Sequence, residues 1–236
     1  MKKYNYLIFD ADHTLIDYTA DEKDALVRLF SEIGLATSDD VLARAQYLSE
    51  YTWTETGLYD VNEPRIQREY HTLYKTHLDL LFTRIFEEYP CDFSPKRAGE
   101  LLLKYLEDGT NSIFGAKETL RALKEKGYTV CVATNGLYSI QIGRLKGLME
   151  YVDELFVSEK LGVIKPNPTF FEKIFNKLDA NADECLMIGD SLSSDVAGAV
   201  SVEMDCCWYN PKGKTNGSGF TPTFEIGKLT ELLKIL

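Results

Sequence analysis

The sequence predicts an α/β protein with a doubly wound, parallel, Rossmann-like sheet and an all-helical segment inserted after the first strand. Short runs that are apolar on both faces indicate strands in the middle of a parallel sheet. Helical patterns separate the later strands, as right-handed crossover connections require. Between about residues 19 and 108, helical patterns occur without a strand pattern.

The first strand is expected at residues 4–9, where an apolar run ends at two aspartates one residue apart. The inserted segment then carries four helical stretches. They are expected at 19–34, 37–53, 64–89 and 94–109. Thr19 and Glu22 have the spacing of a capping box at the first of them. The sequence therefore predicts a core made of residues 1–16 and 110–236, with a helical cap domain at 17–109.

The rest of the chain alternates strands and helices. Strands are expected at 128–134, 154–158, 185–190 and 206–210, and helices at 115–127, 139–150 and 168–180. A loop rich in Gly, Asn and Pro at 210–222 is expected to precede a last strand and helix.

Composition and charge exclude several classes of protein. The net charge of −11 argues against a nucleic-acid binder, which needs a basic face. No run of about 18 apolar residues occurs, so no membrane span is expected. The N-terminal stretch is too short and too acidic for a signal peptide, which makes the cytoplasm the expected location. The five cysteines include no CxxC pair, and buried reduced thiols are expected.

Polar side chains follow four of the predicted strands at their carboxyl ends. Because ligands of a doubly wound sheet bind beyond those ends, we expect these side chains to meet at one rim. They are Asp10 and Asp12 after the first strand, Thr134 and Asn135 after the second, Lys165 after the third, and Asp190 and Asp195 after the fourth.

The joint chemistry of these residues is phosphoryl transfer. Asp10 is the expected nucleophile, which forms an aspartyl-phosphate, and Asp12 is the expected general acid and base. Lys165 neutralises developing negative charge. We expect Thr134 and Asn135 to bind the phosphate together with Lys165.

Hard carboxylate oxygens at the same rim indicate a magnesium site. We expect Asp10, Asp12 and Asp190 to hold Mg²⁺, with Asp195 acting indirectly. Asp195 has a structural alternative as a helix N-terminal acid.

The stretches "DADHT", "TN", "KPNP" and "GDSLSSD" resemble, in that order, the four signature motifs of the haloacid dehalogenase superfamily. The helical insertion is similar to that superfamily's four-helix cap. The aspartate at position 12 is typical of its phosphatases and absent from its dehalogenases. The resemblance therefore implies a hydrolase of phosphate monoesters that uses Mg²⁺.

A narrower resemblance concerns the substrate. "FDADHT", "ATNG", "VSEKLGVIKPNP" and "CWYN" followed by "PTFEIGKLTEL" resemble the pyrimidine 5'-nucleotidases that act on non-standard nucleotides. The implied substrate is a nucleoside monophosphate with a pyrimidine base. His13 departs from the pattern, since that superfamily usually has glycine there and this family often has glutamate.

Other interpretations stay open at this point. The substrate could be a sugar phosphate or another small phosphorylated metabolite, for a phosphatase or a phosphomutase, or the fold could be an idle interaction module. The chain could be a monomer or a dimer. The cap aromatics Tyr47, Trp53 and Tyr59 fit either a helical core or a surface that stacks on a base. His71 and His77 are not expected to bind a metal, and His13 fits either a substrate contact or an exposed turn.

Overall fold

A computed structural model of the protein describes residues 4–236 and contains one parallel sheet within that range. The strand order is β3-β2-β1-β4-β5-β6. The strands are β1 (Tyr6–Phe9), β2 (Thr129–Thr134), β3 (Glu154–Val157), β4 (Cys185–Gly189), β5 (Asp205–Tyr209) and β6 (Phe224–Ile226). The doubly wound fold and its predicted strands are confirmed. Residues 1–3 of the predicted core segment lie outside the described residues.

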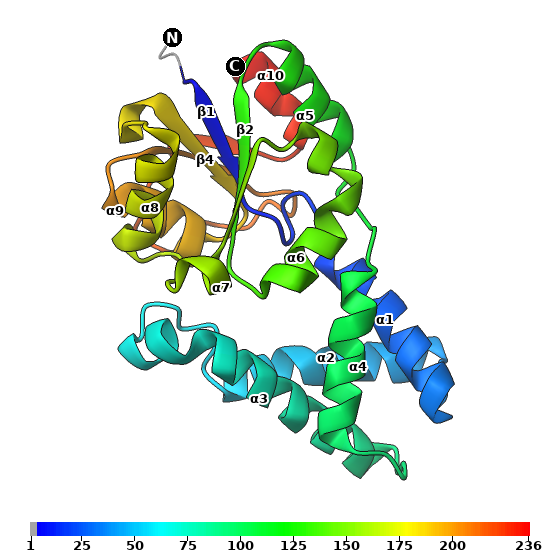
Figure 1. Ribbon diagram of the computed structural model, residues 1–236. Helices are drawn as coiled ribbons and strands as arrows, with labels where there is room; N and C mark the ends of the chain where they lie inside the picture. The colour runs from blue at the N-terminus through cyan, green and yellow to red at the C-terminus, as the bar shows by residue number, and fades with distance from the viewer. Residues whose placement is uncertain (1–3) are drawn as a thin grey trace.

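Alternating side chains of the central strands enter two separate hydrophobic cores, one on each face of the sheet. Leu7 and Phe9 pack on the face covered by α5 (Ala116–Glu125) and α10 (Leu232–Ile235). Ile8 points to the other face, against α8 (Pro168–Leu178) and α9 (Ala197–Ser201). Figure 1 shows the two helical layers with the sheet between them. Burial on both faces explains why the strands are apolar throughout.

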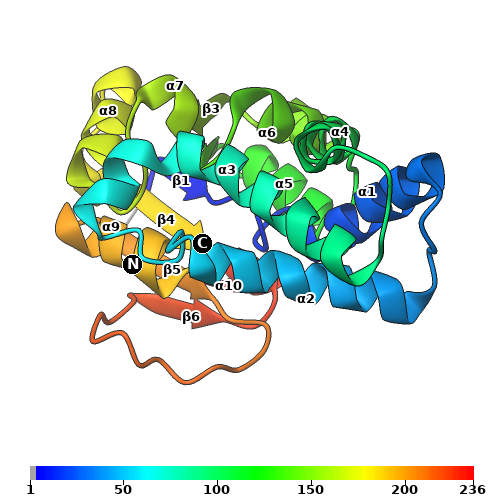
Figure 2. The same ribbon diagram turned by 90° about the horizontal axis from the view of Figure 1, so that it is seen from below.

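Four helices from the inserted segment lie beyond one end of the sheet (Figures 1 and 2). They are α1 (Tyr18–Ile33), α2 (Asp39–Glu55), α3 (Pro64–Glu88) and α4 (Pro95–Glu107), called the cap helices below. Their apolar stripes meet in a core of their own, which includes Leu29, Phe82 and Leu102. Leu137 and Ile140, from the segment after β2, join this core. The cap helices are therefore packed on the main body as well as on each other.

The start of the first cap helix differs from the prediction. Asp17 is the N-cap of α1, and its carboxylate accepts a hydrogen bond from the Ala20 amide at 3.1 Å. The expected capping box of Thr19 and Glu22 is wrong, because the helix begins one residue before Thr19. Glu22 consequently lies inside the helix with a buried side chain. The predicted end at Gly34 is confirmed by its left-handed conformation.

The helix predicted at 139–150 is shorter than expected. Helix α6 (Tyr138–Arg144) stops at Arg144, and two 3₁₀ turns follow at Leu145–Gly147 and Met149–Tyr151. The tighter turns place both Leu145 and Leu148 in the core on the sheet.

Two further sequence expectations can be compared with the structure. The five cysteines are free thiols, of which four are buried and Cys91 is half-buried. Within residues 4–236, no helix combines the length and the apolar character needed to cross a bilayer.

The packing of α6 on α4 depends on Gly143. A Cβ atom at this position would lie 2.3 Å from the Glu107 carbonyl oxygen, a contact that only movement of the backbone relieves. We expect Gly143→Ala to lower the free energy of unfolding by about 2 kcal/mol. Chemical denaturation followed by circular dichroism measures the change.

Gly147→Ala is the matched control, since a Cβ atom at Gly147 meets nothing within 4 Å. It should leave stability unchanged or raise it by up to about 1 kcal/mol. Equal effects of the two substitutions would contradict this account of the helix packing.

Candidate active site

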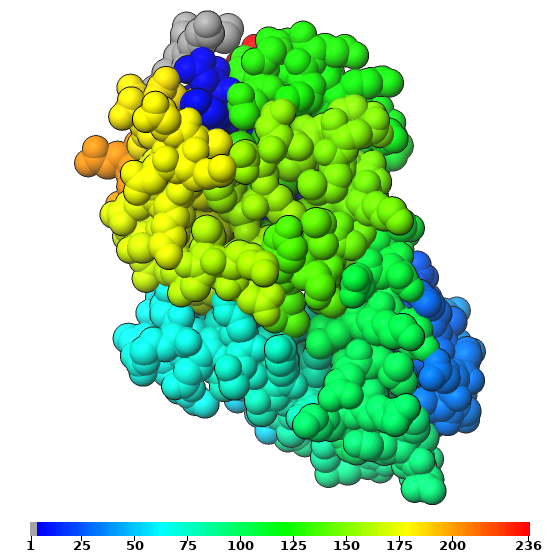
Figure 3. All heavy atoms as spheres, viewed as in Figure 1, coloured from blue at the N-terminus to red at the C-terminus, as the bar shows by residue number. Residues whose placement is uncertain are grey.

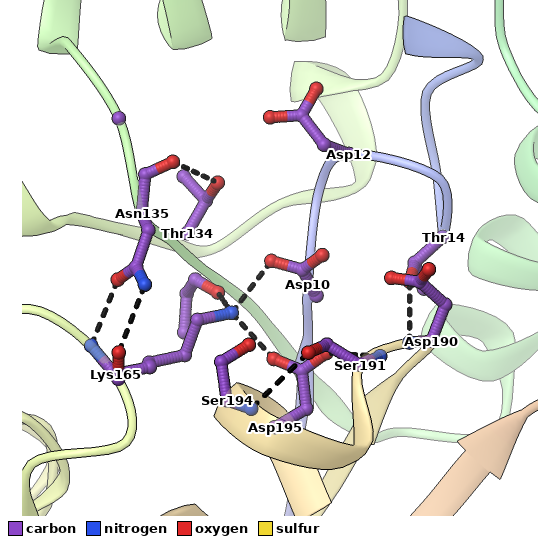
Figure 4. Close-up of polar contacts among 12 residues, drawn as sticks. Asp10, Asp12, Thr14, Thr134, Asn135, Lys165, Asp190, Ser191, Ser194 and Asp195 are labelled. Atoms are coloured by element: carbon purple, nitrogen blue, oxygen red, sulfur yellow. Dashed lines mark hydrogen bonds and ion pairs between the residues drawn. The ribbon is translucent and has the colours of Figure 1, made fainter. Parts of the chain in front are cut away.

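The predicted site residues gather at the carboxyl ends of the central strands, facing the cap helices. Strands β1 and β4 are neighbours, while the sheet continues outward through β2 on one side and β5 on the other. Asp10 directly follows β1 and Asp190 directly follows β4. Figure 4 shows both carboxylates at one place, with Lys165 and Asp195 beside them. This is the topological switch point at which doubly wound sheets bind ligands.

Lys165 is the buried cation at the centre of the site. Its Nζ donates hydrogen bonds to Asp10 Oδ1 at 2.6 Å, to Asp195 Oδ1 at 2.7 Å and to the Ala133 carbonyl oxygen at 2.7 Å. Burial alone would lower the pKa of Lys165, but the charges of Asp10 and Asp195 outweigh it and raise the pKa. The three contacts use all three ammonium protons, so Lys165 is a fixed positive charge.

Three carboxylates surround a space suited to a cation. Ligand atoms of Asp10, Asp190 and Asp195 all lie within 4.8 Å of one another. Burial, together with neighbouring carboxylates, raises the pKa of Asp10 well above its ordinary value and that of Asp190 to about 7. Close carboxylates of this kind fit a divalent cation with a preference for oxygen ligands.

The three carboxylates are not equally free to bind a cation. Both oxygens of Asp195 have partners in the protein, because Oδ1 accepts from Lys165 and Oδ2 accepts from the Ser191 amide at 3.0 Å. The main chain of Asp190 is held by Thr14 Oγ1, which accepts from its amide at 3.1 Å, and by Trp208 Nε1, which donates to its carbonyl at 2.9 Å. The Asp190 side chain is left to point into the site.

The structure separates Asp12 from this carboxylate cluster, although Asp12 was expected among the metal ligands. Its carboxylate accepts hydrogen bonds from Arg144 Nη1 and, at 2.8 Å, from Gln141 Nε2. Burial alone would raise the pKa of Asp12, but the Arg144 guanidinium and these hydrogen bonds outweigh it and lower the pKa. The hydrogen-bond partners of Asp12 are thus different from those of Asp10.

His13 lies in the turn that follows Asp12. Its φ of 61° is in the left-handed region, which favours glycine and which other residues adopt at some cost. The imidazole is exposed, and its ring meets Tyr18 edge-on with the centroids 5.8 Å apart.

Thr134 and Asn135 occupy the end of β2. Thr134 is buried, and its hydroxyl accepts a hydrogen bond from Gln141 Nε2 at 2.6 Å. The Asn135 side chain makes two hydrogen bonds to the main chain of Lys165, donating to the carbonyl at 3.0 Å and accepting from the amide at 2.8 Å. The Asn135 amide group thus holds the Lys165 loop in place.

The sequence analysis missed Arg144, the buried arginine of the site. Its Nε contacts Asp21 Oδ2 at 2.8 Å, and the side chains of both residues are almost fully buried. Arg144 therefore joins α6 to the cap helix α1 as well as to Asp12. Its Nη2 is buried with no hydrogen-bond partner among residues 4–236, and the Arg144 side chain lines the pocket. The available signal was that Gln141 and Arg144, three residues apart, share one face of a predicted helix.

A pocket of about 650 Å³ extends from the carboxylates into the cap helices. Its volume suits a ligand of drug-like size. Aromatic side chains line much of it: Tyr18, Tyr47, Trp53, Tyr59, Tyr70 and Tyr74. The three cap aromatics considered from the sequence are thus all on the pocket wall.

The two cap histidines have other partners. His71 Nε2 lies 2.8 Å from Ser158 Oγ, across the boundary between α3 and α7 (Ser158–Leu161). His77 is buried, with its ring edge-on to Trp53 at 5.1 Å between centroids. Figure 3 shows α3 closely packed against the main body along this boundary.

Comparison with known proteins gives the same family from sequence and from structure. Residues 4–202 match the family described as haloacid dehalogenase-like hydrolase. The chain is 32% identical to pyrimidine 5'-nucleotidase PynA of Streptococcus pneumoniae, over 99% of this chain and 95% of that protein. It is 25% identical to pyrimidine 5'-nucleotidase YjjG of Escherichia coli, over 99% and 98% of the two chains.

A solved structure covers the whole fold. The putative HAD-hydrolase YfnB of Bacillus subtilis superimposes with a TM-score of 0.86 at 30% identity, over 100% of this chain and 99% of that one. That crystal structure is described as bound to magnesium and as revealing interdomain movement.

The ion pair between Arg144 and Asp21 should make a large contribution to stability. Arg144→Met leaves a buried carboxylate without its cation, and we expect the free energy of unfolding to fall by about 3 kcal/mol. Arg65→Met is the control, because the Arg65 to Glu69 pair is exposed and should be worth no more than about 0.5 kcal/mol. Urea denaturation of both variants tests this, and similar losses would contradict it.

The pKa of Asp190 predicts a dependence of stability on pH. Since the pKa is about 7 in the folded protein and ordinarily 3.8, the folded state retains a proton that the unfolded chain releases. The stabilisation is complete at low pH and is lost as the pH rises through 7. In EDTA, the free energy of unfolding of Asp190→Asn relative to wild type should therefore rise by about 2 kcal/mol as the pH increases from 5 to 8.

Thermal and urea denaturation across this pH range measure the effect. Asp60→Asn, at an exposed position of the cap segment, is the control and should show no such trend. A stability difference for Asp190→Asn that does not change with pH would refute the predicted linkage.

Proposed function

The chain belongs to the haloacid dehalogenase-like hydrolase family, and we propose that it is a Mg²⁺-dependent phosphomonoester hydrolase that acts on nucleoside monophosphates, with a preference for pyrimidine bases. One observation carries the proposal: Asp10 contacts Lys165 in a cluster of three carboxylates, while the Asp12 carboxylate is held separately by Gln141. We expect it to act in the cytoplasm on small phosphorylated substrates.

Asp10 acts as the nucleophile in the first step. One of its oxygens attacks the phosphorus in line, a bond forms between Asp10 and the phosphoryl group, and the bond to the ester oxygen breaks. Asp12 donates a proton to the departing alkoxide. Arg144 lowers the pKa of Asp12, but the negative charge of a bound phosphate raises it. The phosphate therefore favours the protonated form of Asp12 that this step needs.

Asp12 acts as the base in the second step. It removes a proton from the water that attacks the aspartyl-phosphate, which releases inorganic phosphate and restores Asp10. Arg144 and Gln141 hold Asp12 as the carboxylate that this step uses. Asp12 thus returns to the protonated state that begins the next cycle.

The Thr134 hydroxyl is the proposed contact for a phosphoryl oxygen, while Lys165, whose three protons are already donated, acts on the phosphate through its charge. The fixed charge of Lys165 also offsets the charge that develops on Asp10 and on the phosphate. Asn135 contributes by holding the main chain of Lys165, which keeps the lysine in position. Asp10 and Asp190 would hold Mg²⁺, with Asp195 orienting Lys165 and the loop at Ser191. When bound, the ion supplies charge neutralisation for the phosphate.

The aromatic lining of the pocket supports a nucleotide over a sugar phosphate. Tyr70, Tyr74 and Trp53 line the pocket, and aromatic rings can stack on a planar base whatever its identity. A sugar phosphate has no planar ring to use these surfaces. The catalytic cluster also disfavours an idle interaction module, because buried carboxylates destabilise a fold that does not use them.

Residues 17–109 are proposed to act as the cap that covers the substrate. Polar contacts join the cap helices to the main body at four places: Arg144 with Asp21, Asn111 with Asp21 and Asp24, His71 with Ser158, and Asn167 Nδ2 with Gln67 Oε1 at 3.3 Å. Because this boundary has a small number of polar contacts, the cap can open for the substrate and close around it. Closure excludes water from the aspartyl-phosphate.

The test is hydrolysis of a panel of nucleoside monophosphates and sugar phosphates, with phosphate release as the readout. We expect UMP, CMP and TMP to give kcat/KM values at least about tenfold above those of ribose 5-phosphate and glyceraldehyde 3-phosphate. EDTA should abolish activity and Mg²⁺ should restore it.

Asp10→Asn is the control for the mechanism and should lose activity by a factor of roughly 10³ or more, because the amide is no nucleophile. No hydrolysis of any pyrimidine monophosphate by the wild-type protein would overturn the proposed substrate. Full activity of Asp10→Asn would overturn the mechanism.

A further inference from the structure

A second buried carboxylate lies in the pocket on the cap side, outside the catalytic cluster. Glu22 is 6% exposed and lines the pocket from α1. Its hydrogen-bond donors are neutral: Ser49 Oγ at 2.7 Å, Tyr18 Oη at 3.4 Å and Gln46 Nε2 at 3.4 Å. No Lys or Arg side chain within residues 4–236 forms an ion pair with it. Glu22 is thus held in position without being neutralised.

The two oxygens of Glu22 differ in how fully they are used. Oε1 accepts the short hydrogen bond from Ser49, and the weak one from Tyr18. Oε2 has only the long contact from Gln46, whose Nε2 also donates to the Thr19 carbonyl at 2.9 Å. A buried carboxylate oxygen with spare acceptor capacity is costly unless a further donor reaches it. The open pocket is the side from which such a donor can come.

Glu22 is connected to the catalytic end of the pocket by two tyrosines. Tyr74 lines the same pocket as Asp12 and Glu22, and burial together with the charges of both carboxylates raises the pKa of this phenol to about 12. Tyr18 contacts Glu22 through its hydroxyl and carries the Arg144 guanidinium over its ring at 5.1 Å. One ligand can therefore have its phosphate at Asp10 and its far end at Glu22.

The chemistry at the far end requires a planar group with an N–H on its edge. Aromatic walls favour a flat ring, and the carboxylate accepts a hydrogen bond from an N–H donor. Uracil and thymine present a ring N–H, and cytosine presents an amino group that carboxylates recognise in nucleic acids. Sugar phosphates present neither feature.

We propose that Glu22 reads the base of the substrate by accepting a hydrogen bond from the N–H edge of the pyrimidine, with Ser49 and Gln46 holding its carboxylate in position. The inference rests on the proposed nucleotidase function. It assigns the base-reading group to the first cap helix, at a position ten residues after Asp12 in the sequence.

The experiment compares substrates that differ by one methyl group. UMP has the N3–H, 3-methyl-UMP lacks it, and 5-methyl-UMP has a methyl group of equal size but keeps the N3–H. For the wild-type protein, kcat/KM should fall roughly 10- to 100-fold for 3-methyl-UMP and little for 5-methyl-UMP. Ribose 5-phosphate, which has no base, reports on the catalytic centre alone.

Substitution of Glu22 should remove this discrimination. Glu22→Ala should lower kcat/KM for UMP roughly 10- to 100-fold, without a further loss for 3-methyl-UMP and without a change for ribose 5-phosphate. Glu22→Gln, which keeps an acceptor oxygen, should recover part of the activity on UMP. Glu100→Gln removes a carboxylate from an exposed position of α4 and should leave all substrates unaffected.

The outcomes separate this inference from the proposed function. Hydrolysis of UMP with equal activity on 3-methyl-UMP, or with no effect of Glu22→Ala, overturns the role of Glu22 and leaves the nucleotidase function standing. If the wild-type protein hydrolyses ribose 5-phosphate but not UMP, the proposed substrate is wrong and the inference falls with it. Parallel losses of Glu22→Ala on UMP and ribose 5-phosphate identify a structural role and overturn the inference.

Discussion

The buried ammonium group of Lys165 is the interaction on which the site depends. Three carboxylates with ligand atoms within 4.8 Å of one another would repel strongly without a cation. Lys165 contacts two of them and a main-chain carbonyl, which uses its whole capacity for donation. Its position is fixed in turn by the paired hydrogen bonds from Asn135. Asp10, the proposed nucleophile, is therefore oriented by a chain of contacts that begins at the end of β2.

Arg144 is the buried cation that joins the main body to the cap helices. Its guanidinium lies between Asp12, in the catalytic loop, and Asp21, in α1. The proposed acid/base residue is thus tied to the segment that is proposed to cover the substrate. Because Ile140 of α6 and Leu137 directly before this helix also pack into the cap core, polar and apolar contacts hold the same boundary. A change in the position of α1 would act directly on the surroundings of Asp12.

The site has two ends with different chemistry. At the sheet, charged groups of fixed geometry suit a phosphate, whose form is the same in every substrate of this kind. At the cap helices, aromatic rings and a carboxylate with neutral partners suit a planar group with N–H donors. This division lets one catalytic centre serve many substrates, since exchanging cap side chains alters recognition without disturbing the chemistry.

The sequence by itself determined the doubly wound sheet, the helical insertion, and the cluster of Asp10, Lys165 and Asp190. Strands buried on both faces have an unmistakable apolar pattern, and parallel strands must bring their carboxyl ends to one rim. Only the tertiary structure decided the partners of Arg144, the separate surroundings of Asp12, and the position of Glu22. The contacts of Arg144 and Asp12 join residues more than a hundred positions apart in the sequence. The position of Glu22 depends on the residue at which α1 begins. A local pattern carries no record of them, because the side chains meet only after the cap helices pack on the sheet.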